Sequence, residues 1–268
     1  MLTAQELAFG ARREILKMTS AAGASHVGSA LSVVDILATL YSGSAHISRE
    51  LVAEPDRDVV ILSKGHSAAA LYAILSLKDF FPQEWLEGYC KNGAQLGGHV
   101  TSKRVPGIEL STGSLGHGLP YGAGIALSRK RSSTIGRVFV VLSDGECDEG
   151  TTWESALIAN HHDLDNLVVV IDRNGIQSLA STEETLRLEP LAEKWKSFGW
   201  NVLVCNGHSF QELNEAFKKD SKRPTCIIAN TTKGNGVSFM ENSVLWHYRS
   251  PGSEELNEAL QELENDNS

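Results

Sequence analysis

Hydrophobic residues along this chain form two kinds of pattern that alternate. From Thr3 to Met18 they recur every three or four positions, as on the apolar face of a helix, and Thr3 with Glu6 forms a capping box at its start. Elsewhere, short apolar runs lack a polar face, which predicts strands buried on both sides. Strands are expected over residues 58–62, 138–142, 167–171, 200–205 and 225–231.

Helical patterns separate these strands. We expect further helices over residues 33–41, 68–77, 151–162, 191–198 and 210–218. Ser32 is expected to cap the first of them. Residues 92–118 are rich in glycine and lack periodicity, so they suit a loop that wraps around a ligand. The alternation of elements predicts an α/β fold, a mostly parallel sheet with helices on both faces.

The composition fits one large domain without a nucleic-acid or membrane partner. With 268 residues, 41% of them hydrophobic, the chain can bury a large core over residues 1–250. An amphipathic helix and a polar tail from Glu264 are expected within residues 251–268. The net charge of −9 would repel nucleic acid and anionic lipid.

Cysteine spacing and the N-terminus favour a cytoplasmic protein. The four cysteines form no CxxC pair, as in a reducing compartment, so neither disulfides nor zinc are expected. The N-terminus lacks a basic start followed by an apolar run, and we find no stretch that approaches 18 uncharged apolar residues. We therefore expect neither export nor a membrane span.

An acidic and an amide residue follow two of the predicted strands, at the point where each strand ends. Asp144 follows the strand at 138–142, and Asn174 follows the strand at 167–171. In a parallel sheet both lie at the carboxyl edge, where open α/β sheets bind ligands. Their oxygens can hold Mg²⁺ if backbone carbonyls, water or a phosphorylated ligand complete its shell. The alternative is that these residues only form turns after the strands, because Asp-Gly and Asn-Gly favour turns.

The same residues carry a family resemblance. The stretch from Ser143-Asp144-Gly145 to Asn174 resembles the thiamine diphosphate motif, with Ser143 in place of the usual first glycine. Further motifs are GASHVG (23–28), SKGHS (63–67), GGH (97–99), STGSLGHG (111–118) and KGNGV (233–237). In this order they resemble transketolase, from about residue 7 to residue 247.

The resemblance implies thiamine diphosphate and Mg²⁺ as cofactors, with Ca²⁺ or Mn²⁺ able to replace the magnesium. The implied metal ligands are the side chains of Asp144 and Asn174 and the backbone carbonyl of Ile176. Gly145 would let the backbone approach the diphosphate closely. The residues implied to bind the cofactor are His66, Gly113, Leu115, Ser143, Asp144, Gly145, Glu149, Asn174 and Ile176.

Four histidines are the implied catalytic residues: His26, His66, His99 and His247. The resemblance implies that they line the channel over the thiazolium ring, with His66 also near the diphosphate. Imidazoles suit this chemistry because a pKa near neutrality lets them donate to sugar hydroxyls and carry protons. The alternative for any single one of them is a solvated loop histidine.

Three acids follow Asp144 in the same turn. The resemblance implies that Glu149 helps to link two thiamine sites across a dimer, although an acid at a helix start is also favoured by the helix dipole. Glu146 and Asp148 are expected to face solvent. His117 takes the place of a glutamine common in longer transketolases, and no role is assigned to it.

The resemblance covers only part of a transketolase. In this family the glutamate that activates the aminopyrimidine ring lies on a second α/β domain, and the sequence ends at Ser268 before one. Residues 1–250 therefore resemble the diphosphate-side (PP-type) domain, and the chain resembles the N-terminal subunit of a split transketolase. The expected partner is a C-terminal subunit with the pyrimidine-binding domain, in an α₂β₂ assembly that acts on a sugar.

Three functions follow from this reading. The first is transfer of a two-carbon ketol unit from a ketose, expected to be phosphorylated, to an aldose, by a transferase that is active only with its partner. The second is a carboligase subunit of the deoxyxylulose-phosphate-synthase kind, which would use pyruvate as its donor instead of a ketose. The third is a scaffold or regulatory subunit, which would fail to bind the cofactor.

Overall fold

A single parallel sheet organises the fold of residues 2–266, the part of the chain that the computed structural model describes. Its strands lie in the order β1-β2-β3-β5-β4, and each neighbouring pair is parallel. The strands are β1 (Val59–Leu62), β2 (Val138–Ser143), β3 (Leu167–Arg173), β4 (Asn201–Asn206) and β5 (Thr225–Asn230). All five match predicted strands to within two residues at each end.

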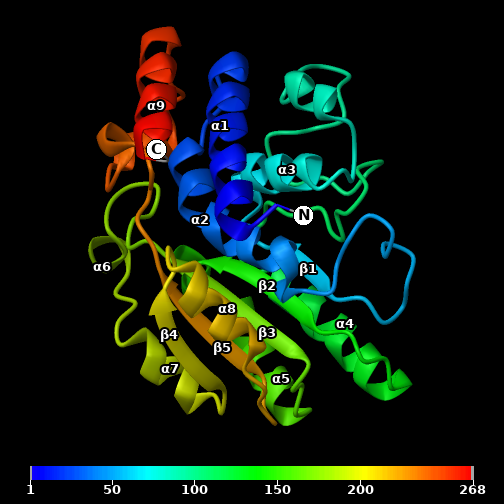
Figure 1. The fold of residues 1–268 in the computed structure, drawn as a ribbon. Coiled ribbons are helices and arrows are strands. Elements are labelled where there is room, and N and C mark those ends of the chain that lie inside the picture. Colours follow the sequence, from blue (N-terminus) through cyan, green and yellow to red (C-terminus); the bar gives the residue numbers. More distant parts are fainter. Residues whose placement is uncertain (1, 267–268) are drawn as a thin grey trace.

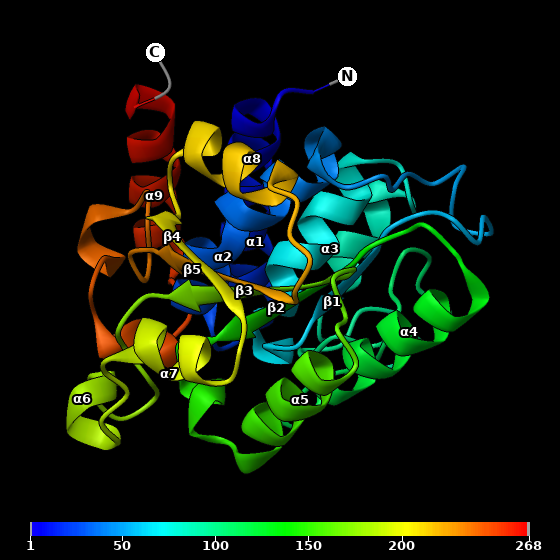
Figure 2. The same cartoon turned by 90° about the horizontal axis from the view of Figure 1, so that it is seen from below.

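Helices cover both faces of the sheet, so the predicted α/β architecture is confirmed (Figures 1 and 2). The helices are α1 (Ala4–Ala22), α2 (Val27–Thr39), α3 (Ala68–Leu77), α4 (Gly118–Ser132), α5 (Gly150–His161), α6 (Thr182–Thr185), α7 (Leu191–Ser197), α8 (Phe210–Lys218) and α9 (Ser253–Asp266). Shorter helical turns are η1 (Leu40–Ser44), η2 (Gly65–Ser67), η3 (Gln83–Gly88), η4 (Asp144–Asp148), η5 (Ser238–Met240) and η6 (Val244–His247).

Alternate residues of the strands enter two separate cores. On β2, Phe139 and Val141 pack with α1, α2, α3 and α8, while Val138 and Val140 pack with α4, α5 and α7. Figure 2 shows the sheet between these two helical layers, with α9 against α1. Because both faces are covered, the strands are apolar at nearly every position, which is why they appear in the sequence as continuous runs.

The start of α1 confirms the predicted capping box. Thr3 Oγ1 accepts a hydrogen bond from the Glu6 amide at 3.2 Å, and the Glu6 carboxylate accepts one from the Thr3 amide at 2.8 Å. The helix runs four residues beyond Met18, as far as Ala22. It ends at Gly23, whose φ of 59° is the left-handed conformation that glycine tolerates best.

The predicted start of the second helix is wrong. α2 begins at Val27, directly after His26, and Ser32 lies inside the helix without capping it. Ser32 is buried, and its hydroxyl donates to Asp172 on β3 at 2.6 Å. Since α2 is buried on every side, it has no polar face to mark its beginning in the sequence.

Helix α4 has no counterpart among the predicted elements. It begins at Gly118, where the glycine-rich loop ends, and packs on β2. A Cβ atom at Gly122 would lie 2.4 Å from Val140 Cγ2, so glycine is needed for this close approach. Glycine lowers helix propensity, which hides the element from a reading of the sequence alone.

One segment is long and apolar enough to cross a membrane by length and mean hydropathy, although it contains Asp35 and several Ser and Thr residues and so is not a run of uncharged apolar residues. Residues Val27–Ser44, which include α2 and η1, meet both criteria. In the structure 83% of this segment is buried inside the protein, between α1, α3 and the sheet. Burial of this kind is typical of the central helix of a globular domain.

The C-terminal helix is present and longer than predicted. α9 packs along α1 through Ala259 and Leu263, both of which are buried. It continues to Asp266, so the polar tail expected from Glu264 begins within the helix. The remainder of that predicted tail, residues 267–268, lies outside the described residues.

Candidate cofactor site

All the residues that the sequence analysis assigned to the site line one cavity. It has a volume of about 380 Å³ and opens at the carboxyl ends of β2 and β3. The assigned residues in its wall are His26, His66, His99, Gly113, Leu115, Ser143, Asp144, Gly145, Glu149, Asn174, Ile176 and His247. A larger cavity of about 590 Å³, between α1 and η3, contains none of them.

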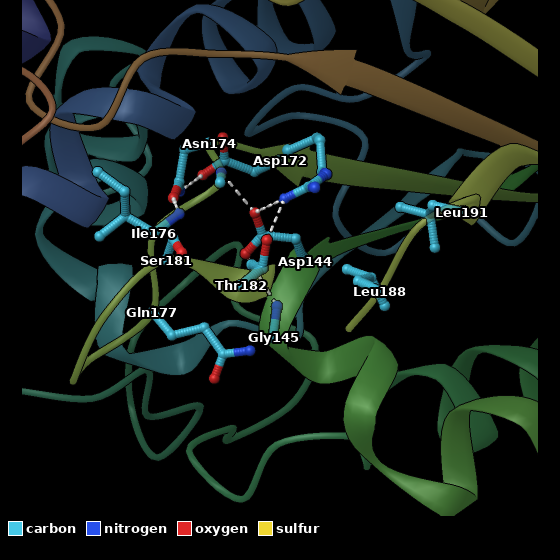
Figure 3. Close-up of polar contacts among 12 residues, drawn as sticks. Asp144, Gly145, Asp172, Asn174, Ile176, Gln177, Ser181, Thr182, Leu188 and Leu191 are labelled. Carbon is cyan, nitrogen blue, oxygen red and sulfur yellow. Dashed lines mark hydrogen bonds and ion pairs between the residues drawn. The ribbon is translucent and has the colours of Figure 1, made fainter. Parts of the chain in front are cut away.

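Asp144 and Asn174 occupy the two turns that follow β2 and β3 (Figure 3). Asp144 is 2% exposed, and its Oδ2 accepts hydrogen bonds from the Gly175 amide at 2.7 Å and from Arg173 at 3.1 Å. Asn174 Oδ1 accepts from the Ile176 amide at 3.1 Å. The side-chain oxygens of both turns therefore lie at one edge of the sheet.

The oxygen atoms at this edge are suitable ligands for a magnesium ion that also binds a phosphorylated ligand. Within residues 2–266 no group of three His, Cys, Asp or Glu side chains could hold a metal alone. Burial raises the pKa of Asp144, although the Gly175 amide and Arg173 oppose the rise. A cation beside Asp144 would stabilise the charged carboxylate, and Mg²⁺ takes further oxygens from phosphates.

Two buried lysines also belong to the site, and neither was predicted from the sequence. Lys64, in the SKGHS motif, is fully buried and forms an ion pair with Asp172. Lys233 Nζ donates to the carbonyls of Ile176 at 3.0 Å and Gln177 at 3.3 Å. Burial and the charge of Lys64 lower the pKa of Lys233 to about 8. Both lysines line the cavity, where they can attract an anionic ligand.

The four histidines form one cluster, although they come from four separate segments. The ring of His26 is central, with centroids 4.8 Å from His247, 5.3 Å from His66 and 5.8 Å from His99. Burial, with the neighbouring positive groups, lowers the pKa of His26 to about 4 and that of His247 to about 3. Burial and Lys64 also hold the pKa of His66 well below its usual value. These three rings are therefore neutral at pH 7.

His26 is held in an unusual conformation at the centre of this cluster. Its φ of 74° is in the left-handed region, which is uncommon for a residue with a side chain. Its ring Nδ1 is buried and has no hydrogen-bond partner among the described residues. Strain and an unsatisfied buried nitrogen together are typical of a residue kept for binding or catalysis.

The acids after Asp144 do not all lie as expected. Glu149 is exposed at the cavity wall and precedes α5. Asp148 is half-buried and accepts from Gln177 at 2.7 Å, and Glu146 is fully buried. The expectation of solvent exposure is therefore wrong for Glu146, whose partner Ser63 lies 83 positions away in the sequence, while Asp148 is partly exposed. The exposed His117 is not part of the cavity wall.

A parallel α/β domain with these oxygens, lysines and histidines at one sheet edge is suited to a phosphorylated cofactor. The family described as "Transketolase, thiamine diphosphate binding domain" matches residues 5–267. The chain therefore belongs to the transketolase family.

Similar proteins include short subunits and full-length enzymes. The chain is 38% identical over 254 residues to a subunit of the apulose-4-phosphate transketolase of Actinobacillus succinogenes, covering 94% of this chain and 92% of that protein. It is 38% identical over 256 residues to "6-deoxy-6-sulfo-D-fructose transketolase subunit SqwG" of a Clostridium species, covering 94% and 93%. The transketolase structure from Campylobacter jejuni superposes with a TM-score of 0.91 at 28% identity.

The family model identifies the chain with the thiamine diphosphate-binding domain of a transketolase, and the lengths of the relatives show how much of the enzyme that is. The superposition on the Campylobacter jejuni structure includes 97% of this chain but only 42% of that one. The alignment with human transketolase, at 32% identity, includes 40% of the human protein. This chain thus spans about two fifths of a full-length transketolase and nearly all of the subunit-sized relatives. The prediction of an N-terminal, thiamine diphosphate-binding transketolase subunit is confirmed.

Proposed function

We propose that this chain, with a second subunit carrying the pyrimidine-binding domain, transfers a two-carbon ketol unit from a ketose to an aldose. The observation that carries the proposal is the single cavity, which gathers all the residues assigned from the family motifs. Two relatives of similar length are named as subunits of transketolases, which supports a separate partner. We place the activity in the cytoplasm, in keeping with four free thiols.

In the proposed site, Mg²⁺ is held by the carboxylate of Asp144, the Asn174 Oδ1 and the carbonyl of Ile176. Lys64 and Lys233 supply positive charge on the side of the site that holds the diphosphate. Gly145, which has no side chain, lets the backbone approach the diphosphate closely. Glu149 stands at the wall of the cavity, where it can link two sites in an α₂β₂ assembly. Thiamine diphosphate, when bound, supplies the carbanion chemistry that transfers the two-carbon unit.

The histidine cluster acts on the sugar in this proposal. Because His26, His66 and His247 are neutral, each has one ring nitrogen that donates and one that accepts. In His247 the accepting nitrogen is Nδ1, which takes a hydrogen bond from Lys233 at 2.9 Å and leaves Nε2 to donate to a sugar hydroxyl. His99 completes the wall beside His26. Two relatives are named for apulose 4-phosphate and 6-deoxy-6-sulfofructose, sugars with an anionic end. We infer an anionic ketose, expected to be phosphorylated, as the donor here.

The partner is expected to cover an apolar surface. Tyr121 on α4 and the adjacent Leu157 and Ile158 on α5 are 53%, 58% and 53% exposed. α4 and α5 pack side by side, and α5 begins directly after Glu149 at the cavity wall. Apolar side chains exposed beside a site are typical of a surface that another chain covers.

The metal assignment is tested by Asp144→Ala. We expect the affinity of the assembled complex for thiamine diphosphate, titrated with Mg²⁺ present, to fall by orders of magnitude while the fold survives. Asp148→Ala is the matched control and should keep its affinity, because Asp148 lies in the same cavity wall but accepts from Gln177 and is not an implied metal ligand. Unchanged affinity in Asp144→Ala would refute the assignment.

The need for a partner is tested by assaying ketol transfer with and without the C-terminal subunit. We expect the purified chain to be silent alone and active in the complex, with a ketose and not pyruvate as donor. Full activity of this chain by itself would show that the split-enzyme proposal is wrong. Cofactor binding without any transfer to an aldose would favour a different carboligase.

A further inference from the structure

Glu146 lies in the turn after β2 and is fully buried, yet it is not part of the cavity wall. Its Oε1 accepts hydrogen bonds from the Ser63 hydroxyl at 2.5 Å and from the Gly116 amide at 3.0 Å. Its Oε2 accepts from the Ser143 amide at 2.9 Å. The Ser63 hydroxyl in turn accepts from the Gly118 amide at 3.1 Å. One carboxylate thus joins three segments of the chain.

Each of these segments supplies the cavity wall. Ser63 is followed by Lys64 and His66, and Ser143 is followed by Asp144. The loop of residues 111–118, which holds the Gly116 amide, contributes Gly113 and Leu115. Glu146 therefore sits behind the site, at the point where the SKGHS segment, this loop and the acidic turn meet.

The loop of residues 111–118 is attached at its start through Thr112, whose hydroxyl donates to the Leu62 carbonyl at 2.7 Å and whose amide donates to the Val100 carbonyl at 3.1 Å, and its far end is packed tightly. A Cβ atom at Gly118 would lie 2.3 Å from Ser63 Oγ, and one at Gly116 would lie 2.6 Å from Glu149 Cβ. Gly116 also has a φ of 76°. Because Gly116 and Gly118 have no side chains, this end of the loop is attached through its backbone: the Gly116 carbonyl accepts from Thr151 Oγ1 at 2.9 Å, and the Gly116 and Gly118 amides need buried acceptors.

A carboxylate is suited to this place because it offers two acceptor oxygens and no donor when ionised. The four direct donors to Glu146, which include the Ser143 hydroxyl at 3.5 Å, use both oxygens. In a glutamine, one oxygen would become an amide that points its own hydrogens at either the Ser143 amide or the Gly116 amide. The length of the side chain would stay the same, so the change replaces one acceptor oxygen by a donor and removes the charge without altering the size of the group.

We propose that Glu146 is a positioning residue of the cofactor site, which holds the SKGHS segment, the 111–118 loop and the acidic turn in one arrangement before the cofactor binds. The proposal rests on the proposed function only for the identity of the ligand. The attachment of the loop itself follows from the hydrogen bonds. Glu146 makes no contact with the reacting atoms in this role.

The test is Glu146→Gln in the assembled complex, read by amide hydrogen exchange without cofactor or substrate. We expect exchange at residues 116–118 to become about 10- to 100-fold faster, the range for losing hydrogen bonds to a charged group, while the Thr112 amide, which donates to the Val100 carbonyl, should be unaffected. Thiamine diphosphate affinity should fall by a similar factor. Wild-type exchange in this loop, or faster exchange with unchanged cofactor affinity, would overturn the proposal.

Two further variants keep the result interpretable. Glu6→Gln is the matched control, because Glu6 forms the same kind of capping box with Thr3 at the far end of the chain, and we expect neither readout to change. Ser63→Ala removes only the link to Gly118 and one donor to Glu146, so a smaller effect centred on residue 118 is expected. Should Glu146→Gln fail to fold, wild-type behaviour of Ser63→Ala would refute the proposal.

The readouts separate this proposal from the proposed function. Loop exchange is measured without cofactor, and it depends on Glu146 whether or not the complex transfers a ketol unit. A complex that shows the expected exchange and affinity changes but no transfer would contradict the function and support the positioning role. Normal ketol transfer with unchanged loop exchange in Glu146→Gln would support the function and contradict the positioning role.

Discussion

The buried cluster around Asp35 gives the sharpest prediction for stability. Arg12 on α1 forms an ion pair with Asp35 on α2, with 2.7 Å between Nη2 and Oδ2, and the two residues are 8% and 2% exposed. His208 Nδ1 also contacts Asp35 Oδ2 at 2.7 Å. Asp35 Oδ1 is buried without a partner among the described residues. Arg12 therefore supplies much of the positive charge that stabilises the buried Asp35 carboxylate.

Arg12→Met keeps the aliphatic stem of the side chain and removes its charge. Breaking a buried ion pair from one side typically costs about 3–5 kcal/mol of unfolding free energy, because the other charge is left uncompensated. His208 still contacts Asp35, so we expect a loss of about 3 kcal/mol, near the lower end. The measurement is urea denaturation at pH 7, followed by circular dichroism.

Arg13→Met is the matched control on the same helix. Arg13 pairs with Glu264 at 3.6 Å, and the two side chains are 38% and 57% exposed. Exposed pairs of this kind contribute about 0–1 kcal/mol, so the control should lose less than about 1 kcal/mol. Equal losses in the two variants would refute the argument from burial.

The effect of pH provides a second check on Arg12→Met. Burial would raise the pKa of Asp35, but the charge of Arg12 and the hydrogen bonds from His208 and Arg12 hold it below its usual value. A depressed folded pKa stabilises the fold above the unfolded value of about 3.9, and this contribution is lost as the pH falls through the folded pKa. The difference between wild type and Arg12→Met should therefore be largest near neutrality and shrink on acidification. A difference that grows on acidification would contradict this sign.

Two further predictions concern the site. In His26→Ala and His66→Ala, kcat should fall by about 10²–10⁴-fold with little change in cofactor affinity, because a proton-transfer group is lost. Steady-state rates equal to wild type would show that both histidines have only a structural role in their loops. Gly118→Ala should weaken cofactor binding and lower the thermal midpoint, since its Cβ would lie 2.4 Å from Ser63 Cβ. Gly124→Ala, on the same helix with open space around it, is the control and should be neutral or slightly stabilising, and equal losses in the two variants would refute the steric reason.

The sequence by itself determined the class of fold and twelve of the residues in the cavity wall, although not Lys64 or Lys233. Strands buried on both faces, such as residues 138–142, are visible because every position is apolar, and Asp144 and Asn174 are visible because turn residues follow such strands. These signals are local, so they survive without knowledge of the packing. The capping box at Thr3 is another local signal of this kind.

Only the tertiary structure decided what lies behind the cavity wall. Glu146 looks like a surface acid in its acidic turn, yet its partner Ser63 is 83 positions away. The ion pair of Lys64 with Asp172 spans 108 positions. α2 begins earlier than expected because burial on all sides removes its periodicity, and α4 was missed because it contains glycines, one of which, Gly122, packs on β2. Burial and pairing depend on which distant segments meet, and that information is absent from any short window of the chain.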